Sequence, residues 1–531
     1  MKVSFLVDDG RVRTMEKRQG NRSQTGFVWI VGAGPGDARL LTLKAKYCLE
    51  QADVVIYDRL VSPSVLSLAP PNAEFIYSGK TPKGEKTSQE WINKTMIAKA
   101  KEGKKVVRLK NGDPFVFGRG AEEAEALYNA GVPFEIVPGV TSVVAVPAYA
   151  GIPLTDRRFA SNFAVLVGKK AKGKNPKHLA DFQKLAQADT VIALMAVEEL
   201  EEVTEQIMSG GKPPDTPAAI IEWGTTPRQK VVVSTLKNLS RDARAHDIQP
   251  PAVIVTGEVV KFRESLAWYE HRPLFGKRIL IANIEGMETF ANALGDLGAE
   301  VINLPVAKFE PNTAEASLEK VLNEVVKGNY EWIVFSNPYG VETFFESVYQ
   351  RGFDVRAFPS IKFAAIGPFT KEALKQRGIH PNVVIERRNG KKAAEIFIPM
   401  TKKQKEKTRF LIWDGDNEFG GLVEGLSQLG RTDRVRAYRT VTVPLPEGFL
   451  NLVLREPIHI VIFTTPLVIE AFFEAVGVEK SRQILTKADL TVFVSSSEQT
   501  LKRHGIKPST ILEVSSIKEV ANSLVRILPK G

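Results

Sequence analysis

Short apolar runs alternate with helical patterns along most of the chain. Before residue 263 the strand-like runs fall at residues 27–31, 53–57, 105–109, 133–137, 163–167, 190–195, 218–222 and 252–256. Such alternation is typical of an α/β fold. Residues 1–26 are polar and basic without apolar periodicity, which predicts a flexible extension. Residues 263–275 contain Trp268, Tyr269 and Pro273, which predict a connector that packs against the protein and is not a flexible linker.

A second α/β series begins with the run 277–282, and short motifs in it resemble one another. The segment Phe335-Ser336-Asn337-Pro338 begins a helix in the same way as Phe463-Thr464-Thr465-Pro466. Residues 364–368, with the helix that ends at Gly378, likewise resemble residues 491–497, with the helix that ends at Gly505. Such similarities between short motifs also arise by chance between α/β units. Two similar lobes with a cleft between them are the simplest interpretation.

The first strand leads into a glycine-rich loop, Val-Gly-Ala-Gly-Pro-Gly-Asp, at residues 31–37. A strand, a glycine turn and a helix suit an adenosine cofactor that approaches the backbone closely. A dinucleotide fingerprint, however, requires glycine where Asp37 stands, and Pro35 lacks an N–H group that a phosphate would use. The loop therefore favours a nucleoside without a diphosphate, with S-adenosylmethionine as the candidate. A nicotinamide-dependent oxidoreductase is the disfavoured alternative.

Polar residues follow four strand-like runs of the first half. Asp58 comes after the run 53–57 and Lys80 after the run 75–79, while Asn111-Gly112-Asp113 and Thr141-Ser142 follow two others. In open α/β sheets, ligands bind beyond the carboxyl ends of the strands. Taken singly, each residue also has a structural explanation: Asp58 as a helix cap, Lys80 as an ordinary surface lysine and Asp113 as a turn residue. Asp113 also suits a ribose or an ammonium group.

Composition narrows the class of protein. The 531 residues carry a net charge of +11, but Lys and Arg are spread along the chain and form no basic helix with interleaved aromatics. Nucleic acid is therefore not expected, and a polyanionic small molecule or a solvated basic surface accounts for the charge. No apolar run approaches the ~18–20 residues that span a membrane. One cysteine, Cys48, excludes an internal disulfide and a thiolate metal cluster, so we expect a cytoplasmic protein without a metal site.

The order of these motifs resembles the uroporphyrinogen-III C-methyltransferases of the tetrapyrrole methylase family over residues 27–262. Residues 151–155, Gly-Ile-Pro-Leu-Thr, and residues 223–227, Trp-Gly-Thr-Thr-Pro, belong to the resemblance. It implies a homodimer in which each chain binds S-adenosylmethionine between two α/β subdomains. The cofactor contacts that it implies are Pro35, Asn111, Gly112, Asp113, Val116, Thr141, Ser142, Met195 and Gly224. Asn111 stands where the family usually has glycine.

The same resemblance implies the chemistry of the first half. Asp58 would accept a proton and Lys80 would donate one, while uroporphyrinogen III is methylated at C2 and C7 to precorrin-2, on the way to sirohaem or cobalamin. The eight carboxylates of that substrate suit basic residues near the strand ends. Arg59, Arg119, Arg157 and Arg158 are the candidates by position, with ordinary surface ion pairs as the alternative.

Residues 276–531 resemble uroporphyrinogen-III synthase. The resemblance rests on residues 333–337, 365–368, 435–440 and 463–466. It implies two α/β lobes, with the second inserted at about residues 312–438, and cyclisation of hydroxymethylbilane without a cofactor. Tyr438 matches the tyrosine favoured for assisting the departure of water.

A bifunctional enzyme that makes and then methylates uroporphyrinogen III is the resulting hypothesis. One alternative makes the second half a catalytically silent module that delivers substrate. Another makes the first half a methylase of a later corrin intermediate, against which the motif at residues 57–62 and the synthase-like neighbour argue.

Overall fold

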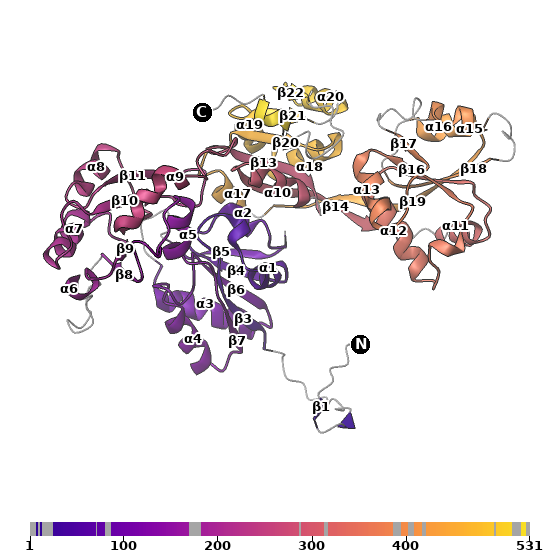
Figure 1. Ribbon diagram of the computed structural model, residues 1–531. Helices are drawn as coiled ribbons and strands as arrows, with labels where there is room; N and C mark the ends of the chain where they lie inside the picture. The colour runs from indigo at the N-terminus through magenta and orange to yellow at the C-terminus, as the bar shows by residue number, and fades with distance from the viewer. Residues whose placement is uncertain are drawn as a thin grey trace.

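The computed structural model describes most of the chain as three α/β units (Figure 1). The described residues are 7–8, 11–12, 25–70, 72–79, 87–168, 182–285, 288–312, 317–385, 394–401, 408–416, 421–445, 447–492, 495–511 and 522–526. Most of the predicted extension at residues 1–26, and Lys80, lie outside these ranges. Within the extension, β1 (Val7–Asp8) and β2 (Arg11–Val12) pair antiparallel.

The first subdomain is a parallel sheet of five strands in the order β5-β4-β6-β3-β7. Its strands are β3 (Phe27–Gly32), β4 (Val54–Tyr57), β5 (Glu74–Tyr77), β6 (Lys105–Lys110) and β7 (Phe134–Val137). Its helices are η1 (Ala38–Leu40), α1 (Leu43–Glu50), α2 (Pro63–Leu66), α3 (Gln89–Lys101), α4 (Gly120–Asn129) and α5 (Ser142–Tyr149). The strands are apolar on both faces because each face is covered. Helices α3 and α4 cover one face, and α1 and α2 pack on the other.

The second subdomain is a mixed sheet in the order β11-β10-β12-β9-β8. Its strands are β8 (Phe163–Val167), β9 (Thr190–Leu194), β10 (Pro217–Glu222), β11 (Lys230–Thr235) and β12 (Ala252–Thr256). Its helices are α6 (Phe182–Leu185), α7 (Leu200–Ser209), α8 (Leu239–Ala245), η3 (Glu258–Phe262) and α9 (Arg263–Leu266). Val143 and Val146 of α5 belong to the core on one face of this sheet, so α5 joins the two subdomains.

The C-terminal half is built on a ten-stranded sheet in the order β17-β16-β15-β18-β19-β14-β13-β20-β21-β22. The strands are β13 (Arg278–Ile284), β14 (Glu300–Pro311), β15 (Trp332–Phe335), β16 (Lys362–Ile366), β17 (Val383–Ile385), β18 (Arg409–Gly415), β19 (Arg431–Thr442), β20 (Ile460–Phe463), β21 (Asp489–Val492) and β22 (Thr510–Ile511). The helices are α10 (Glu288–Asp296), α11 (Ser317–Val326), α12 (Pro338–Tyr349), η4 (Val355–Ala357), α13 (Pro368–Gln376), α15 (Ile398–Thr401), α16 (Leu422–Ser427), α17 (Glu447–Val453), α18 (Pro466–Val476), α19 (Val478–Leu485) and α20 (Ser495–Arg503).

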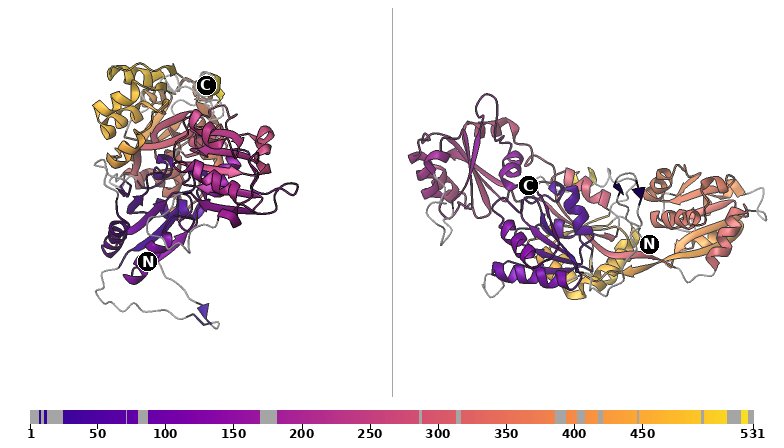
Figure 2. Two further views of the ribbon diagram at one scale, coloured as in Figure 1. Left: turned by 90° about the vertical axis from the view of Figure 1, so that its left-hand side faces the viewer. Right: turned by 90° about the horizontal axis from the view of Figure 1, so that it is seen from below.

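Two long strands divide this sheet into lobes. Neighbouring strands are parallel except β14 and β19, which pair antiparallel from Ala307–Thr442 to Pro311–Tyr438. The lobe of β15–β18 lies to one side of the rest of the molecule, joined to it through these two strands (Figures 1 and 2). In each lobe a parallel strand leads into a helix that begins at proline, α12 in one and α18 in the other. This arrangement agrees with the two similar lobes that the similar motifs in the second half of the sequence predicted.

The C-terminal half packs against the first subdomain through a common core. Phe449 of α17 lies 5.9 Å, centroid to centroid, from the ring of Phe75 in β5. Val65 and Leu66 of α2 are buried in the same cluster. The face of the first sheet that carries α1 and α2 is therefore also covered partly by α17, which comes from the C-terminal half of the chain (Figure 1).

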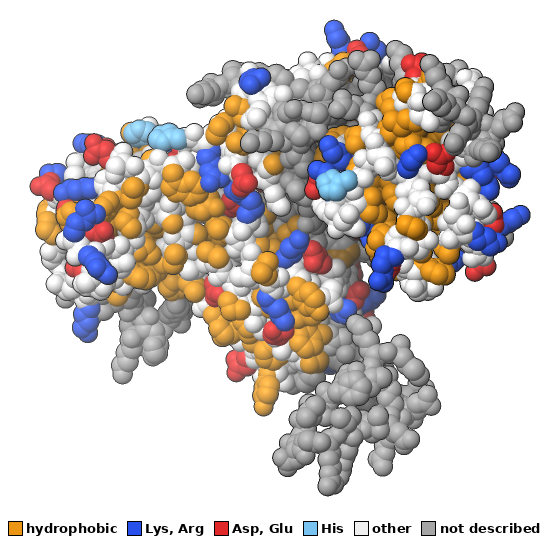
Figure 3. Space-filling view, turned by 45° about the vertical axis from the view of Figure 1, so that its right-hand side comes forward, with side chains coloured by type: hydrophobic (Ala, Val, Ile, Leu, Met, Phe, Trp, Pro, Cys, Tyr) orange, Lys and Arg blue, Asp and Glu red, His pale blue; other side chains and the backbone are white. Residues whose placement is uncertain are grey.

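Basic side chains are spread over the surface, as they are along the sequence. On the face shown in Figure 3, Lys and Arg side chains are scattered among acidic and apolar ones and form no continuous stripe. None of the helices within the described residues combines the length and the apolar character that a membrane span requires.

Candidate active site

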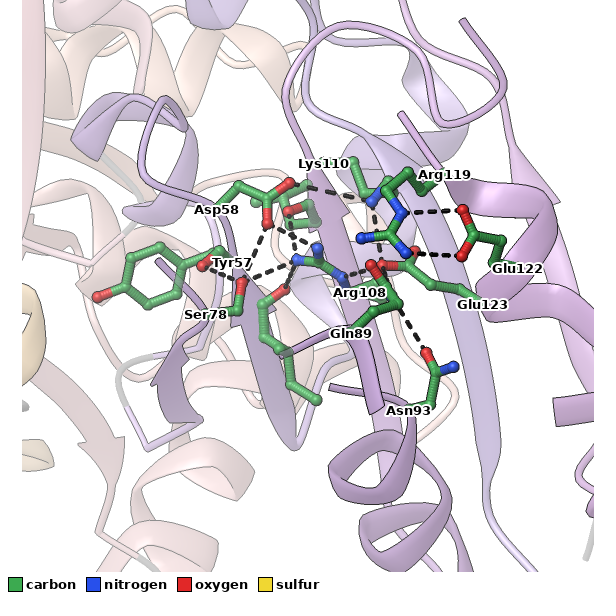
Figure 4. A network of polar contacts seen from close by, with 12 residues as sticks. Tyr57, Asp58, Ser78, Gln89, Asn93, Arg108, Lys110, Arg119, Glu122 and Glu123 are labelled. Carbon is green, nitrogen blue, oxygen red and sulfur yellow. Dashed lines mark hydrogen bonds and ion pairs between the residues drawn. The ribbon is translucent and has the colours of Figure 1, made fainter. Parts of the chain in front are cut away.

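A network of charged side chains lies at the carboxyl ends of β4 and β6 (Figure 4). At its centre, Arg108 Nη2 lies 2.6 Å from Asp58 Oδ1, and Arg108 Nε donates to Glu123 Oε1 of α4 at 3.0 Å. The Lys110 ammonium donates to the same Glu123 oxygen at 3.0 Å and lies 4.0 Å from Asp58 Oδ2. Ser78 donates to Asp58 Oδ1 at 3.0 Å. Two cations therefore face two carboxylates.

The network is buried because of where its members lie in the sheet. Arg108 and Lys110 alternate along β6, so both side chains lie on the face that α3 and α4 cover. Their exposed fractions are 2% and 4%, and that of Glu123 is 0%. Burial lowers the pKa of Lys110, and the charge of Arg108 lowers it further, against the opposing pull of Glu123 and Asp58. Burial also opposes the charge of Arg108, but Asp58 and Glu123 outweigh it and raise its pKa.

Asp58 is the member of the network that reaches the surface. Its side chain is 32% exposed. Its Oδ1 is occupied by Arg108 and Ser78, whereas Oδ2 accepts no hydrogen bond from any described residue and has Lys110 at 4.0 Å. The carboxylate is thus fixed through one oxygen while the other remains able to accept a proton from a bound molecule.

The glycine-rich turns beside this network pack backbone against backbone. Gly34 and Gly112 exchange backbone hydrogen bonds of 3.2 and 2.7 Å. A Cβ atom on Gly32 would lie 2.5 Å from the Cα of Gly139, so glycine is required for the two turns to meet. The Asp113 oxygens accept from two backbone N–H groups at 2.8 and 3.0 Å, the second belonging to Gly139. In this structure the Asp113 carboxylate holds the turns together.

Asp37, where a dinucleotide fingerprint has glycine, binds within the protein. Its Oδ2 accepts from the Tyr149 hydroxyl at 2.9 Å and pairs with Arg39 at 2.8 Å. Burial and the neighbouring Asp37 charge raise the pKa of Tyr149. Arg39 also reaches Asp296 of α10 at 2.8 Å. Asp37 therefore links the loop to α5 and, through Arg39, to the C-terminal half.

A cavity of about 600 Å³ opens beside these turns, between the two subdomains and the C-terminal half. Five of the nine predicted cofactor residues line it, namely Pro35, Asn111, Ser142, Met195 and Gly224. Apolar side chains from the second subdomain, Leu194, Ile221 and Val253, form part of its wall. The structure thus brings together five predicted cofactor residues that are up to 189 positions apart in the sequence.

The other four predicted cofactor residues do not line this cavity. Gly112 and Asp113 lie in the paired turns, as described above. Thr141 caps α5, where its hydroxyl accepts from the Val143 N–H at 3.3 Å. Val116 is exposed in the loop before α4. Gly112, Asp113 and Thr141 thus stabilise the turns that carry Asn111 and Ser142.

Of the four arginines predicted to bind substrate, Arg59 lines the cavity. Arg119 pairs with Glu122 at 2.7 Å and Arg158 with Asp156 at 2.9 Å, so both are engaged in surface ion pairs. Arg157 does not line the cavity.

A second polar cluster lies in the outer lobe of the C-terminal half. Tyr438 of β19 is 1% exposed, accepts a hydrogen bond from the Asn337 amide and donates to Asp414 Oδ1 at 3.4 Å. Ser336 also donates to this Asp414 oxygen. Burial raises the pKa of Tyr438, and the Asp414 charge adds to the rise. The cluster gathers residues that follow β15 with residues of β18 and β19.

Comparisons with known proteins match both halves. The family described as Tetrapyrrole (Corrin/Porphyrin) Methylases matches residues 28–240, and Uroporphyrinogen-III synthase HemD matches residues 288–522. The porphyrin biosynthesis protein HemD of Ruminiclostridium josui is 37% identical over 418 residues, which cover 78% of this chain and 82% of that protein. The chain belongs to the family of fused tetrapyrrole methylases and uroporphyrinogen-III synthases. The predicted α/β fold and the predicted fusion are confirmed.

Further relatives resemble the methylase. A uroporphyrinogen-III C-methyltransferase of Bacillus subtilis is 39% identical over 357 residues, 67% of this chain and 72% of that protein. A crystal structure of the Thermus thermophilus uroporphyrin-III C-methyl transferase with S-adenyl homocysteine is 40% identical, covers 44% of this chain and 94% of that chain, and has a TM-score of 0.39. Below, the methylase domain means the first two subdomains, and the synthase domain means the ten-stranded sheet with its helices.

Sequence reasoning missed three residues of the methylase network, Arg108, Lys110 and Glu123. A signal was present, because Arg108 and Lys110 are charges at alternate positions in an otherwise apolar strand. Alternate positions share one face of a strand, so a charged pair there requires a buried partner. Glu123 in the following acidic helix is that partner.

Proposed function

We propose that the synthase domain cyclises hydroxymethylbilane to uroporphyrinogen III and that the methylase domain methylates this product at C2 and C7 to precorrin-2. The observation that supports the methylase assignment most directly is the cavity at the strand ends, whose wall contains Arg59, the residue that follows the oriented Asp58. Asp58 itself is not one of the residues that line the cavity. Precorrin-2 would then serve sirohaem or cobalamin synthesis.

The residues of the cavity fit S-adenosylmethionine. A volume of about 600 Å³ lies within the range usual for small-molecule sites. Pro35, Gly224 and the apolar wall suit an adenosine, and Ser142 and Asn111 offer hydrogen bonds to its polar groups. The Asn111 side chain makes no hydrogen bond to any described residue, so its amide is available to a ligand. When bound, S-adenosylmethionine supplies a methyl group on a positively charged sulfur.

The protein's own contribution is alignment and proton acceptance. Methylation of a pyrrole carbon leaves positive charge on the ring, and a proton then leaves the macrocycle. Asp58 Oδ2 would stabilise that charge and accept the proton. Arg108 and Ser78 hold Oδ1, so the carboxylate does not have to reorient during the reaction. Lys80, proposed as a proton donor, lies outside the described residues.

For the synthase domain, we propose that Tyr438 assists the departure of water from hydroxymethylbilane. The proposal is supported by its hydrogen bonds to Asn337 and Asp414, which fix the position of the hydroxyl between strands of the outer lobe. A cyclisation that inverts the last pyrrole ring depends chiefly on holding the chain folded, which suits a site between two lobes.

We further propose that the enzyme acts in the cytoplasm as a homodimer formed through the methylase domain. The single cysteine, Cys48, is buried in the core, which suits a reducing compartment. The methylase domain leaves large apolar side chains exposed, among them Leu43, Phe115 and Val144, which a second copy would cover. Light scattering of the purified chain measures the oligomeric state, and a monomer would contradict the dimer.

One experiment tests both activities of the full chain. It is incubated with hydroxymethylbilane and methyl-labelled S-adenosylmethionine, and the products are separated by isomer and label content. Two labels on each type III macrocycle are expected. Type I macrocycle as the sole cyclised product would refute the synthase and favour a silent binding module. Type III product without label would refute the methylase.

The variant Asp58→Asn tests the proton acceptor. Methyl transfer from supplied uroporphyrinogen III should be lost, while the affinity for S-adenosylmethionine, measured by calorimetry, stays close to that of the unmodified chain. Asp215→Asn is the control, because Asp215 is an exposed aspartate in a surface ion pair with Lys237. Unchanged turnover in Asp58→Asn would refute the assigned role.

A further inference from the structure

The synthase domain forms part of the wall of the methylase cavity. Alongside the methylase residues, the cavity is lined by Arg278, Glu300, Leu452, Arg455 and Glu456. Leu452 belongs to α17, which packs against α2 and β5 of the methylase domain, and Arg455 and Glu456 follow this helix (Figure 1). The methylase site is therefore bounded by residues from both ends of the chain.

The segment that carries Arg455 is held on both sides. Arg278, which is buried, donates from Nη1 to the carbonyl oxygens of Val453 and Glu456 at 2.8 and 2.6 Å. Its Nε donates to Glu300 at 3.1 Å. The Glu456 carboxylate pairs with Arg228 of the methylase domain at 2.7 Å. The backbone around Arg455 is thus fixed against the cavity.

The Arg455 guanidinium lies over the methylase domain. Its central carbon is 4.8 Å from the centroid of the Tyr77 ring at the end of β5. Tyr77 pairs in register with Tyr57, the residue before Asp58. The Arg455 charge also acts on the Tyr57 hydroxyl, opposing the rise in its pKa that burial causes. Arg455 is therefore close to the strand end that carries the proposed proton acceptor.

Two arginines in the cavity wall are available to bind an anionic ligand. The wall contains four arginines and three glutamates. Arg278 is paired with Glu300 and Arg228 with Glu456, and the third glutamate, Glu198, has an interaction of its own. Arg59 and Arg455, both exposed, form no ion pair with any described residue. Guanidinium groups bind carboxylates in a bidentate manner, so a ligand rich in carboxylates would complete this arrangement.

We propose that Arg455 binds a side-chain carboxylate of the macrocycle that the methylase domain methylates. The synthase domain thus supplies a substrate-binding residue to the methylase site of the same chain. The inference rests on the proposed methylase function and adds to it a residue outside the methylase domain. Arg59, which lines the same cavity, binds a second carboxylate.

The test compares Arg455→Gln and Arg455→Lys with the unmodified full chain. The KM for uroporphyrinogen III should rise about tenfold in Arg455→Gln, the loss expected for one charge-assisted hydrogen bond, with kcat within about twofold. Arg455→Lys should restore part of the affinity, because it keeps the charge without the planar fork. Binding of uroporphyrin III, followed by quenching of tryptophan fluorescence, should weaken in parallel and gives a readout that needs no turnover. The affinity for S-adenosylmethionine and the rate of the synthase reaction should not change.

Arg482→Gln is the matched control, since Arg482 is an exposed arginine of α19 in the same domain that does not line the cavity. The proposal is overturned if KM and uroporphyrin affinity in Arg455→Gln equal those of this control. It is also overturned if Arg455→Gln lowers the melting temperature and kcat while KM stays constant, which would indicate a structural role. Absence of methyl transfer and of uroporphyrin binding in the unmodified chain would overturn the proposed methylase function together with it.

Discussion

Glu123→Gln should destabilise the protein strongly, although the substitution keeps the shape of the side chain. Glu123 Oε1 accepts from Arg108 at 3.0 Å, from Lys110 at 3.0 Å and from Gln89 at 3.1 Å. The amide removes the charge that offsets two buried cations and leaves Asp58 to face both. Removal of one partner from a buried ion pair costs about 3–5 kcal/mol. Lys110 can limit this cost by releasing its proton, so we expect a loss of about 3 kcal/mol in the free energy of unfolding.

The loss should depend on pH with a definite sign. Burial holds the pKa of Lys110 below its usual range in the folded protein, so the unfolded chain binds more protons and stability increases as pH rises toward the usual pKa of lysine. Without Glu123 the pKa of Lys110 falls further, and this increase begins at lower pH. The difference in stability between Glu123→Gln and the unmodified chain should therefore shrink between about pH 7 and about pH 10.

Urea denaturation followed by far-UV circular dichroism measures both effects. Glu122→Gln is the matched control, because the neighbouring Glu122 forms its ion pair with Arg119 at the surface, where the two side chains are 54% and 56% exposed. Exposed pairs contribute about 0–1 kcal/mol, so the control should remain close to the unmodified chain. Equal destabilisation by the two substitutions, or a gap that widens as pH rises, would refute the role of Glu123 as a buried counter-charge.

Three further substitutions test other parts of the structure. Tyr438→Phe removes the hydroxyl beside Asp414, so type III product should form at least about tenfold more slowly. Methylation of supplied uroporphyrinogen III should be unchanged. A normal synthase rate would show that Tyr438 takes no part in the mechanism. Gly32→Ala places a Cβ atom 2.5 Å from the Cα of Gly139 and should lower the melting temperature and weaken S-adenosylmethionine binding, and normal binding would contradict the close packing of these turns. Phe449→Ala removes a buried ring from the common core and should cost about 3–5 kcal/mol, with loss of stability in both domains; melting of the synthase domain alone would show that the domains are independent.

Much of the fold could be predicted from local apolar patterns. The runs at residues 163–167 and 252–256 coincide with β8 and β12, because both strands are apolar along most of their length. Strand β11 was not predicted, since its apolar run has only three residues, 231–233, between charged and polar ones. The segment 491–497, which the sequence comparison placed before a helix, already contains the start of that helix, because α20 begins at Ser495.

The site was less predictable, because its members meet through tertiary contacts. Asp58 could be located from its place after a strand, but its orientation depends on Arg108 of β6 and on Ser78, which follows β5. Asp113 has the residue type and position of a ligand-binding group, and local sequence does not reveal that two backbone N–H groups use its oxygens. Arg455 could not be associated with the methylase at all, since it is almost 400 residues from Asp58.

The position of Phe449 has a consequence during synthesis of the chain. The ribosome makes β5 long before it reaches α17. The apolar surface around β5 therefore stays uncovered while about 370 further residues are added. At ordinary elongation rates of 5–20 residues per second, this interval is roughly 20–75 seconds. An apolar surface that includes Val65, Leu66 and Phe75 is therefore exposed on the nascent chain for most of its translation, until α17 is made and covers it.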